Sequence, residues 1–199
     1  NLVERARRMY SAELRISQIR AAAQTAPGAV RGALDALVQA SEDLMLDTAA
    51  PYEVLEAAPD PFVQALQTAA GATSEHFNQH PLNVGSLLTF HFELHRYLKL
   101  VEALSDHSLF DVQTFLGTRP STSYGGIEVD AEAAQDKSDA ALCVRNVAPA
   151  CFLRQRFKAL HSVTLFSATL SPPEYAIRLL GLPENTAWID VPPAFPAEH

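Results

Sequence analysis

Two small hydroxyl residues, Ser167 and Thr169, flank Ala168 at the end of an apolar run, just before a helical pattern that starts after Ser171. Buried strands prefer Val, Ile and Leu, and turns prefer Gly, Asn and Asp, so this tripeptide is typical of neither. Hydroxyl groups at a strand-to-helix turn can bond a neighbouring loop or a ligand at little steric cost. Ser167, Ala168 and Thr169 therefore form a candidate site, with plain capping of the turn as the alternative.

Four histidines form a second group with possible chemistry. His76 and His80 are four residues apart, as are His91 and His95, and each pair lies on a predicted helix. On antiparallel helices, two such pairs could hold a zinc ion with four imidazoles, as in a metal-dependent enzyme. Seven histidines in 199 residues also form such spacings by chance. We therefore favour ordinary helix histidines and expect no metal in this chain.

Charge is unevenly distributed along the chain. The net charge of −8 argues against a strongly cationic nucleic-acid module, yet residues 1–20 hold five arginines against two glutamates. On a helix predicted over residues 1–23, Arg8 and Arg15 are seven residues apart and would lie above each other on the polar face. These two arginines are candidate nucleic-acid contacts, and a merely solvated helix face is the alternative.

Hydrophobic spacing predicts a helical first half and a mixed second half. Three more helices are expected, between Val30 and Pro51, over 59–81 and over 82–104. The periodic positions of the first are Val30, Leu34, Leu37, Ser41 and Leu44. Those of the last are Val84, Leu88, Phe92, His95, Leu98 and Val101. Strands are expected over 126–129, 141–147, 162–168 and 187–191. A helix is expected over 149–160, and another has Ser171 as N-cap, Glu174 in a capping box and Gly181 as stop.

Alternation of strands and helices is typical of a parallel sheet. The predicted fold class is therefore α+β and mainly α. It consists of a helical domain over residues 1–116, followed by a partial parallel α/β domain over residues 117–199.

Composition limits the kind of protein. With 48% hydrophobic and 19% charged residues, the chain has the make-up of a globular protein, and it lacks the roughly 18 uncharged apolar residues of a membrane span. Two cysteines are too few for a disulfide framework, so we expect reduced thiols and a cytoplasmic location. Because the chain begins at Asn1 and not at a methionine, we expect it to be a segment of a longer protein.

The stretch "LHSVTLFSATLSPPEYAIRLLGL", residues 160–182, resembles motif III and its surroundings in the XPD/DinG-type superfamily 2 DNA helicases. The start, "NLVERARRMYSAEL", is similar to the helix that follows motif II in that family. Between the two motifs the family inserts a helical Arch domain, which would correspond to residues 1 to about 115. The resemblance spans the chain and is most specific over residues 161–182.

The resemblance implies a segment of an ATP-dependent helicase that moves along single-stranded DNA in repair or replication. Ser167, Ala168 and Thr169 would couple ATP hydrolysis to DNA, and the Arch would gate the strand and could dock a protein partner. ATP, Mg²⁺ and a possible iron–sulfur cluster would be held upstream or in a second motor domain, so this chain alone should be inactive. The alternative function is a helical protein-interaction domain with a non-catalytic α/β tail.

Overall fold

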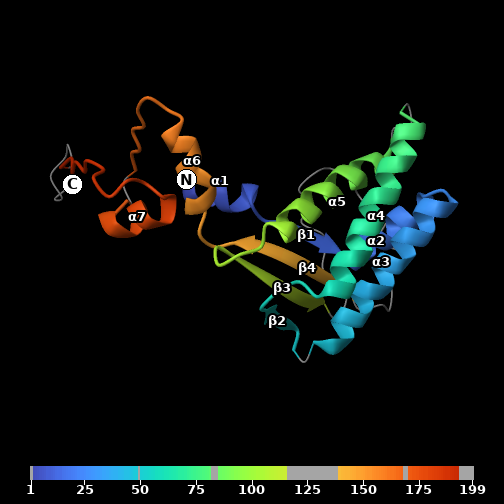
Figure 1. Cartoon of the computed structure of the whole chain (residues 1–199). Coiled ribbons are helices and arrows are strands. Elements are labelled where there is room, and N and C mark those ends of the chain that lie inside the picture. Colours follow the sequence, from blue (N-terminus) through green and yellow to red (C-terminus); the bar gives the residue numbers. More distant parts are fainter. Residues whose placement is uncertain (1, 49, 82–84, 116–138, 168–169, 193–199) are drawn as a thin grey trace, which may run out of the picture. The chain divides into compact units, whose positions relative to one another are not determined.

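The computed structural model describes residues 2–48, 50–81, 85–115, 139–167 and 170–192, and the chain divides into two compact units (Figure 1). The inserted unit is Arg8–Val147. The terminal unit combines Asn1–Arg7 with Ala148–His199, so the two ends of the chain meet in one unit and the middle forms the other. The mainly helical α+β class is confirmed, and β3 and β4 pair across the predicted domain boundary at 116/117.

Four helices form one layer of the inserted unit: α2 (Ile16–Thr25), α3 (Gly28–Asp47), α4 (Asp60–Gln79) and α5 (Ser86–Glu102). Each buries one apolar stripe at the three- and four-residue spacing of an α-helix. In α3 the buried residues are those that the sequence pattern indicates: Val30, Leu34, Leu37, Ser41 and Leu44. These stripes join the largest hydrophobic core of the described residues.

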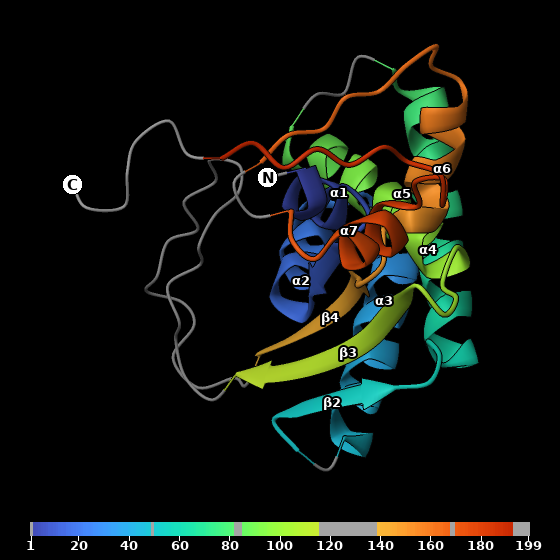
Figure 2. The ribbon, with the colours of Figure 1, turned by 90° about the vertical axis from the view of Figure 1, so that its left-hand side faces the viewer.

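The second layer is a four-stranded sheet in the order β1-β4-β3-β2, made of β1 (Ala12–Arg15), β4 (Asp139–Asn146), β3 (Ser108–Phe115) and β2 (Tyr52–Leu55). Every neighbouring pair is antiparallel. The expectation of a parallel sheet is therefore wrong for the described residues, and only the predicted strand over 141–147 belongs to the sheet. The helices cover one face of this sheet (Figures 1 and 2).

The core lies between the helices and that face of the sheet. Leu14, Leu142 and Val112 are in register on three neighbouring strands and are fully or almost fully buried. Above them the Phe62 ring of α4 meets Tyr97 of α5 edge-on at 6.3 Å between centroids and lies 6.0 Å from Phe110 of β3. Aromatic rings in such tilted pairs add to the stabilisation that burial provides.

The buried side of α5 differs from the predicted one. The structure buries Leu87, Phe90, Leu94, Tyr97 and Val101, whereas Phe92 is 64% exposed. Apolar residues occur all round this helix, so spacing alone allows two registers. Packing of Tyr97 on Phe62 accompanies the observed register, and it leaves Phe92 and His95 outside the core.

The predicted helix over residues 1–23 is also wrong, because a strand interrupts it. Helix α1 spans Leu2–Met9, β1 follows at Ala12–Arg15 and α2 begins at Ile16. Residues 12–15 pair with Val144 through Ala141 of β4, more than 120 positions along the chain. The pairing therefore overrides a local pattern that favours a helix.

The two ends of the inserted unit lie side by side. The backbone N–H of Asn146 donates to Ser11 Oγ at 2.9 Å, and the N–H of Val147 donates to the His107 carbonyl at 2.9 Å. Arg96 of α5 adds three bonds: its Nη2 lies 3.1, 3.4 and 2.8 Å from the carbonyl oxygens of Arg8, Met9 and Ser11. We call residues 8–11 the crossover, because here the chain passes from the terminal into the inserted unit.

The terminal unit has its own small core. Helices α6 (Ala150–Lys158) and α7 (Pro173–Leu180) bury Leu153 and Leu180 together with Ala6 of α1, and Leu165 packs against this cluster. Within the described residues, 162–167 and 187–191 are not strands, contrary to expectation, and the predicted strand over 126–129 lies outside them. Phe166 is 92% exposed and Ile189 82% exposed, so these apolar segments have no sheet to pack on.

Helix α7 is confirmed, but its start differs from the predicted cap. Pro172 and not Ser171 is the N-cap residue, and no side chain caps the helix there. The stop is as predicted: Gly181 has φ of +68°, and the N–H of Leu182 reaches the Ile177 carbonyl at 3.0 Å. A Cβ at residue 181 would lie 2.6 Å from the backbone oxygen of Ala150, so only glycine fits.

Gly181→Ala should destabilise the terminal unit by about 1–3 kcal/mol, because it combines left-handed backbone strain with a clash against the backbone of α6. Gly71→Ala is the matched control, since a Cβ at this position of α4 has no atom within 4 Å. That change should leave stability unchanged or raise it by up to about 1 kcal/mol. Hydrogen exchange of the α6 and α7 amides measures the effect, and equal protection in both variants would contradict it.

Candidate functional site

Ser167 is exposed on a segment without helix or strand between α6 and α7, and Ala168 and Thr169 lie outside the described residues. The described residues before Ala168 do not form the predicted strand. Two residues before Ser167, Leu165 packs on the cluster that contains Ala6 of α1. Ser167 and the first residues of α1 therefore belong to the same compact unit.

The two candidate arginines do not form one stripe. Arg8 is exposed on α1, whereas Arg15 ends β1, because the predicted common helix is broken at β1. Arg15 Nε pairs with Glu13 Oε1 at 2.6 Å, and its guanidinium lies 5.4 Å from the centre of the Phe115 ring. Arg15 is therefore partly engaged within the sheet.

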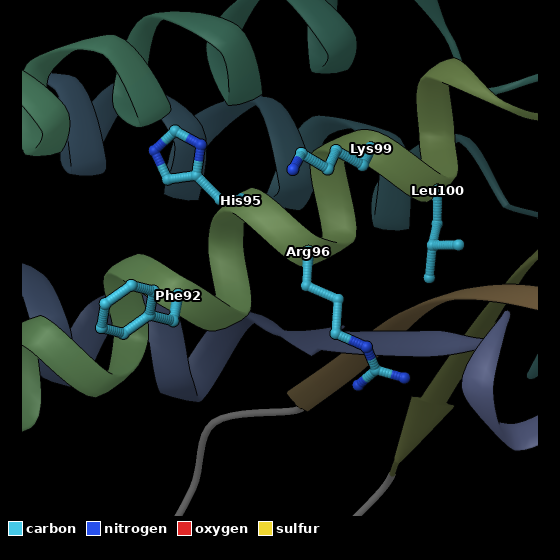
Figure 3. Close-up of a pocket in the computed structure, with 5 residues that line it drawn as sticks. All are labelled: Phe92, His95, Arg96, Lys99 and Leu100. Atoms are coloured by element: carbon cyan, nitrogen blue, oxygen red, sulfur yellow. The ribbon is translucent and has the colours of Figure 1, made fainter.

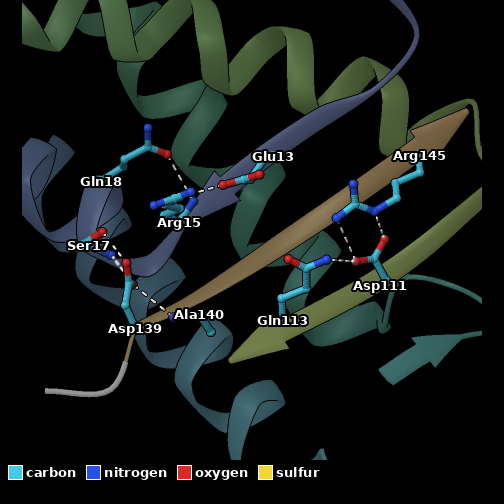
Figure 4. A network of polar contacts seen from close by, with 9 residues as sticks. All are labelled: Glu13, Arg15, Ser17, Gln18, Asp111, Gln113, Asp139, Ala140 and Arg145. Carbon is cyan, nitrogen blue, oxygen red and sulfur yellow. Dashed lines mark hydrogen bonds and ion pairs between the residues drawn. The ribbon is translucent and has the colours of Figure 1, made fainter. Parts of the chain in front are cut away.

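The polar outer face of the sheet has a structural role (Figure 4). Arg145 of β4 donates to the fully buried Asp111 of β3 through Nε at 2.6 Å and Nη2 at 3.2 Å. At the other end of β4, Asp139 accepts the N–H and hydroxyl of Ser17 at 3.0 and 2.7 Å and so binds the first turn of α2. These charge-assisted bonds join neighbouring elements of the inserted unit.

Cys143 is not an activated nucleophile of this face. Cys143 lies opposite Asp111 in the β3–β4 register and is 1% exposed. Burial first, and the Asp111 charge second, raise the pKa of the Cys143 thiol to about 12. Cys143 is therefore a neutral packing group, whereas Cys151 lies exposed on α6.

The histidine pairs approach each other across α4 and α5, where two of the imidazoles bond hydroxyl groups of α4. His91 Nδ1 lies 3.0 Å from Thr73 Oγ1, and His95 Nε2 lies 2.8 Å from Ser74 Oγ. Both hydroxyls also donate to the Ala70 carbonyl, at 3.0 and 2.8 Å. Because a hydroxyl has one proton, each imidazole must be the donor to its hydroxyl. Among the described residues no group of three or more His, Cys, Asp or Glu is arranged to hold a metal ion.

Six rings of α4 and α5 form a continuous series, which runs from the exposed His80 through the half-buried Phe77 to the exposed Phe92. The centroid distances are 4.9 Å for His76–His80, 5.2 Å for His76–Phe77, 5.1 Å for Phe77–His91, 5.4 Å for His91–Phe92 and 4.4 Å for His91–His95. We call these six residues the ring track. The sequence pattern assigned Phe92 and His95 to the periodic stripe of the helix and so missed this surface.

A groove of about 360 Å³ continues the ring track along α5, lined by Phe92, His95, Arg96, Lys99 and Leu100 (Figure 3). Phe92, Arg96 and Lys99 are exposed. Arg96 is held by the three crossover carbonyls through Nη2, which fixes the direction of its guanidinium. Lys99 makes no hydrogen bond or ion pair with any residue that the structure describes. The groove thus joins exposed rings to two cationic side chains.

Comparison with protein-family models, with curated proteins and with solved structures finds no match to this chain. In the described part of the chain, no helix has both the length and the apolar character that crossing a membrane requires. The fold and the surfaces define a mainly helical α+β protein with an inserted helix-and-sheet unit. Its candidate sites are the segment at Ser167 and the ring track with its groove.

His91 should make the inserted unit less stable in mild acid. Burial, and secondly the neighbouring His95, lower the pKa of His91 from its usual 6.5. The unfolded chain then binds the proton more readily than the folded one, so the free energy of unfolding should fall as the pH drops below about 6.5. The loss should be complete once the pH is below the lowered pKa of folded His91.

Urea unfolding between pH 7.5 and 5, followed by helix signal, measures this slope. His91→Gln should remove the His91 share of the slope. His95→Gln should reduce that share without abolishing it, since it takes away only the second of the two causes. An identical pH dependence in the wild-type chain and His91→Gln would contradict the assignment.

Proposed function

We propose that this chain is part of an ATP-dependent DNA helicase of the XPD/DinG type, in which the inserted unit is an Arch-like gate. The observation that carries the proposal is the interrupted topology. Helix α1 packs with α6, α7 and the segment before Ser167, and residues 8–147 leave and re-enter at adjacent points. An insertion of this kind between two motor-domain motifs is what the sequence resemblance implies.

Two exposed apolar segments also support a motor domain that extends beyond this chain. Residues 162–167 and 187–191 are neither helix nor strand, and Phe166, Ile189 and Val191 are each more than 80% exposed. In the proposed helicase these segments would be strands that pair with neighbours contributed by other parts of the protein. Exposed β-branched and aromatic side chains would then become buried in a shared sheet.

Nucleotide and metal would be held elsewhere in that helicase. The chain contains no Gly-rich phosphate loop with its Lys, and its described acidic residues form no metal-binding group. The buried thiol of Cys143 and the single exposed Cys151 do not supply the four thiolates of an iron–sulfur cluster. In this proposal ATP, Mg²⁺ and any such cluster bind other segments, and this chain contributes coupling and strand guidance in a cytoplasmic enzyme.

A second candidate is a protein-docking module. Tyr52 and Val54 on the edge strand β2 are 50% and 44% exposed, and they lie on the sheet face opposite the helices. Such an edge can accept a strand from a partner. The docking function and the helicase function can coexist in one protein. Absence of ATP hydrolysis from the protein with its flanking sequence would leave only the docking function.

The isolated chain should neither hydrolyse ATP nor unwind DNA. The protein expressed with its flanking sequence should do both, with hydrolysis stimulated by single-stranded DNA. In that longer protein, Ser167→Ala with Thr169→Ala should retain most of the hydrolysis while unwinding falls about tenfold or more, since the two hydroxyls are proposed to couple the activities.

Ser162→Ala with Thr164→Ala is the matched control, because these two hydroxyl residues are exposed on the same segment. It should leave both activities near the wild-type level. A proportional loss of hydrolysis and unwinding in the Ser167/Thr169 variant would assign these residues a structural role. Absence of DNA-stimulated hydrolysis from the longer protein would overturn the helicase and favour the docking module.

A further inference from the structure

The ring track combines two features that single-stranded nucleic acid requires of a surface. It offers the exposed Phe92 ring beside the half-buried rings of His91 and Phe77, without any pattern of buried donors that would select one base, and it ends at cationic groups. Bases stack on aromatic and imidazole rings largely independently of sequence, while phosphates bind nearby Arg and Lys. No other described surface brings an unbroken series of rings to a groove lined by Arg and Lys.

The exposure of Phe92 is the observation that most strongly indicates a binding surface on α5. Its side chain is 64% exposed, while Phe90, Leu94 and Tyr97 of the same helix are buried. Phe92, Arg96 and Lys99 follow one another on successive turns of the exposed side, so about 6 Å of helix rise separates Phe92 from Arg96. A ring and a cation at this spacing can contact the base and the backbone of the same strand.

Arg96 is prepared for an anion by its bonds to the crossover. Its Nη2 is engaged by the carbonyls of Arg8, Met9 and Ser11, and its other guanidinium nitrogens make no hydrogen bond with a described residue. A side chain that is already oriented loses less conformational entropy on binding. Lys99 adds a second positive charge one turn further on.

Acidic residues flank this surface without neutralising it. Glu75 of α4 accepts a bond from Gln79 at 3.3 Å, and Glu102 of α5 accepts one from Gln67 at 3.3 Å. Glu93 is exposed next to Phe92. None of the three is ion-paired with Arg96 or Lys99 in the described structure, so both cations remain available to a phosphate.

We infer that the ring track and the α5 groove bind single-stranded nucleic acid, with bases stacked on Phe92 and its neighbouring rings and phosphates at Arg96 and Lys99. The inference rests on the proposed function, for which it names the face of the inserted unit that meets the strand. The inference also connects strand binding to the crossover, because Arg96 would contact the bound strand while it is bonded to the crossover carbonyls. Strand binding should therefore order the crossover.

The test measures binding of a fluorescent oligo(dT) of about 15 nucleotides to the full 199-residue chain by anisotropy over a range of salt concentrations. Phe92→Ala should weaken binding about 5- to 100-fold, and Phe92→Leu nearly as much, because leucine keeps apolar bulk without a π-face. Lys99→Gln should lower the log–log salt slope by about 0.7, the value for one phosphate contact on a single strand.

Matched controls lie in the terminal unit. Tyr175→Ala removes another exposed aromatic ring, and Lys158→Gln removes another exposed lysine. Both should bind oligo(dT) as the wild-type chain does. Helix content by circular dichroism checks that each variant is folded, which is expected because Phe92 and Lys99 are exposed.

Hydrogen exchange of the amides of residues 8–12 measures whether strand binding orders the crossover. Oligo(dT) should slow exchange there at least threefold in the wild-type chain, and Arg96→Gln should abolish this slowing. Inorganic tripolyphosphate tests whether the cationic side chains bind a free polyphosphate in place of single-stranded nucleic acid. If it binds through Lys99 while oligo(dT) does not bind, or if Phe92→Leu binds oligo(dT) like wild type, the single-strand track is overturned.

The remaining outcomes separate this inference from the helicase proposal. Wild-type affinity in Phe92→Ala and Lys99→Gln, in a longer protein that still unwinds DNA, would overturn the track and leave the helicase. Oligo(dT) binding that depends on both residues, in a protein without DNA-stimulated ATP hydrolysis, would support the track and overturn the helicase. No binding of oligo(dT) to the wild-type chain would overturn the track.

Discussion

The arrangement of the inserted unit depends on how its two ends are tied together. Ser11 Oγ accepts the N–H of Asn146, and one nitrogen of Arg96 holds three carbonyls of the crossover. Since these bonds fix where the chain enters and leaves, the start of β1 lies beside the end of β4, and the two strands pair antiparallel. The helices between them can then pack on one face of the resulting sheet.

The hydrophobic spacing and the helix-stop residues predicted those elements that depend on residues close together in the sequence. Helix α3 buries the five residues that its spacing indicates, and Gly181 ends α7 because its backbone is left-handed and α6 lies against it. Helix α5 shows the limit of this approach. With apolar residues on every side, its burial depends on the partner, and Tyr97 against Phe62 occupies the core while Phe92 remains exposed.

Strand pairing and the candidate sites were less predictable, because they depend on residues far apart in sequence. Residues 12–15 fit a helical pattern and become a strand only through β4, which separates Arg15 from the helix that carries Arg8. Residues 162–167 have strand composition but no partner strand in the described structure. The ring track arises from the facing of α4 and α5, so four histidines that suggest zinc by spacing instead extend a series of rings.

The distribution of polar groups gives the sheet and the helices different tasks. On the sheet, Asp111 is fully buried and bonded to Arg145, and Cys143 beside it is held neutral, so this face contributes rigidity. On the helices, Phe92 and Lys99 are exposed, while Arg96 reaches from the same surface to the crossover. A strand held at Arg96 would therefore act on the crossover through one side chain. A gate in the proposed helicase needs such a connection, because binding can alter a passage only through groups that touch both.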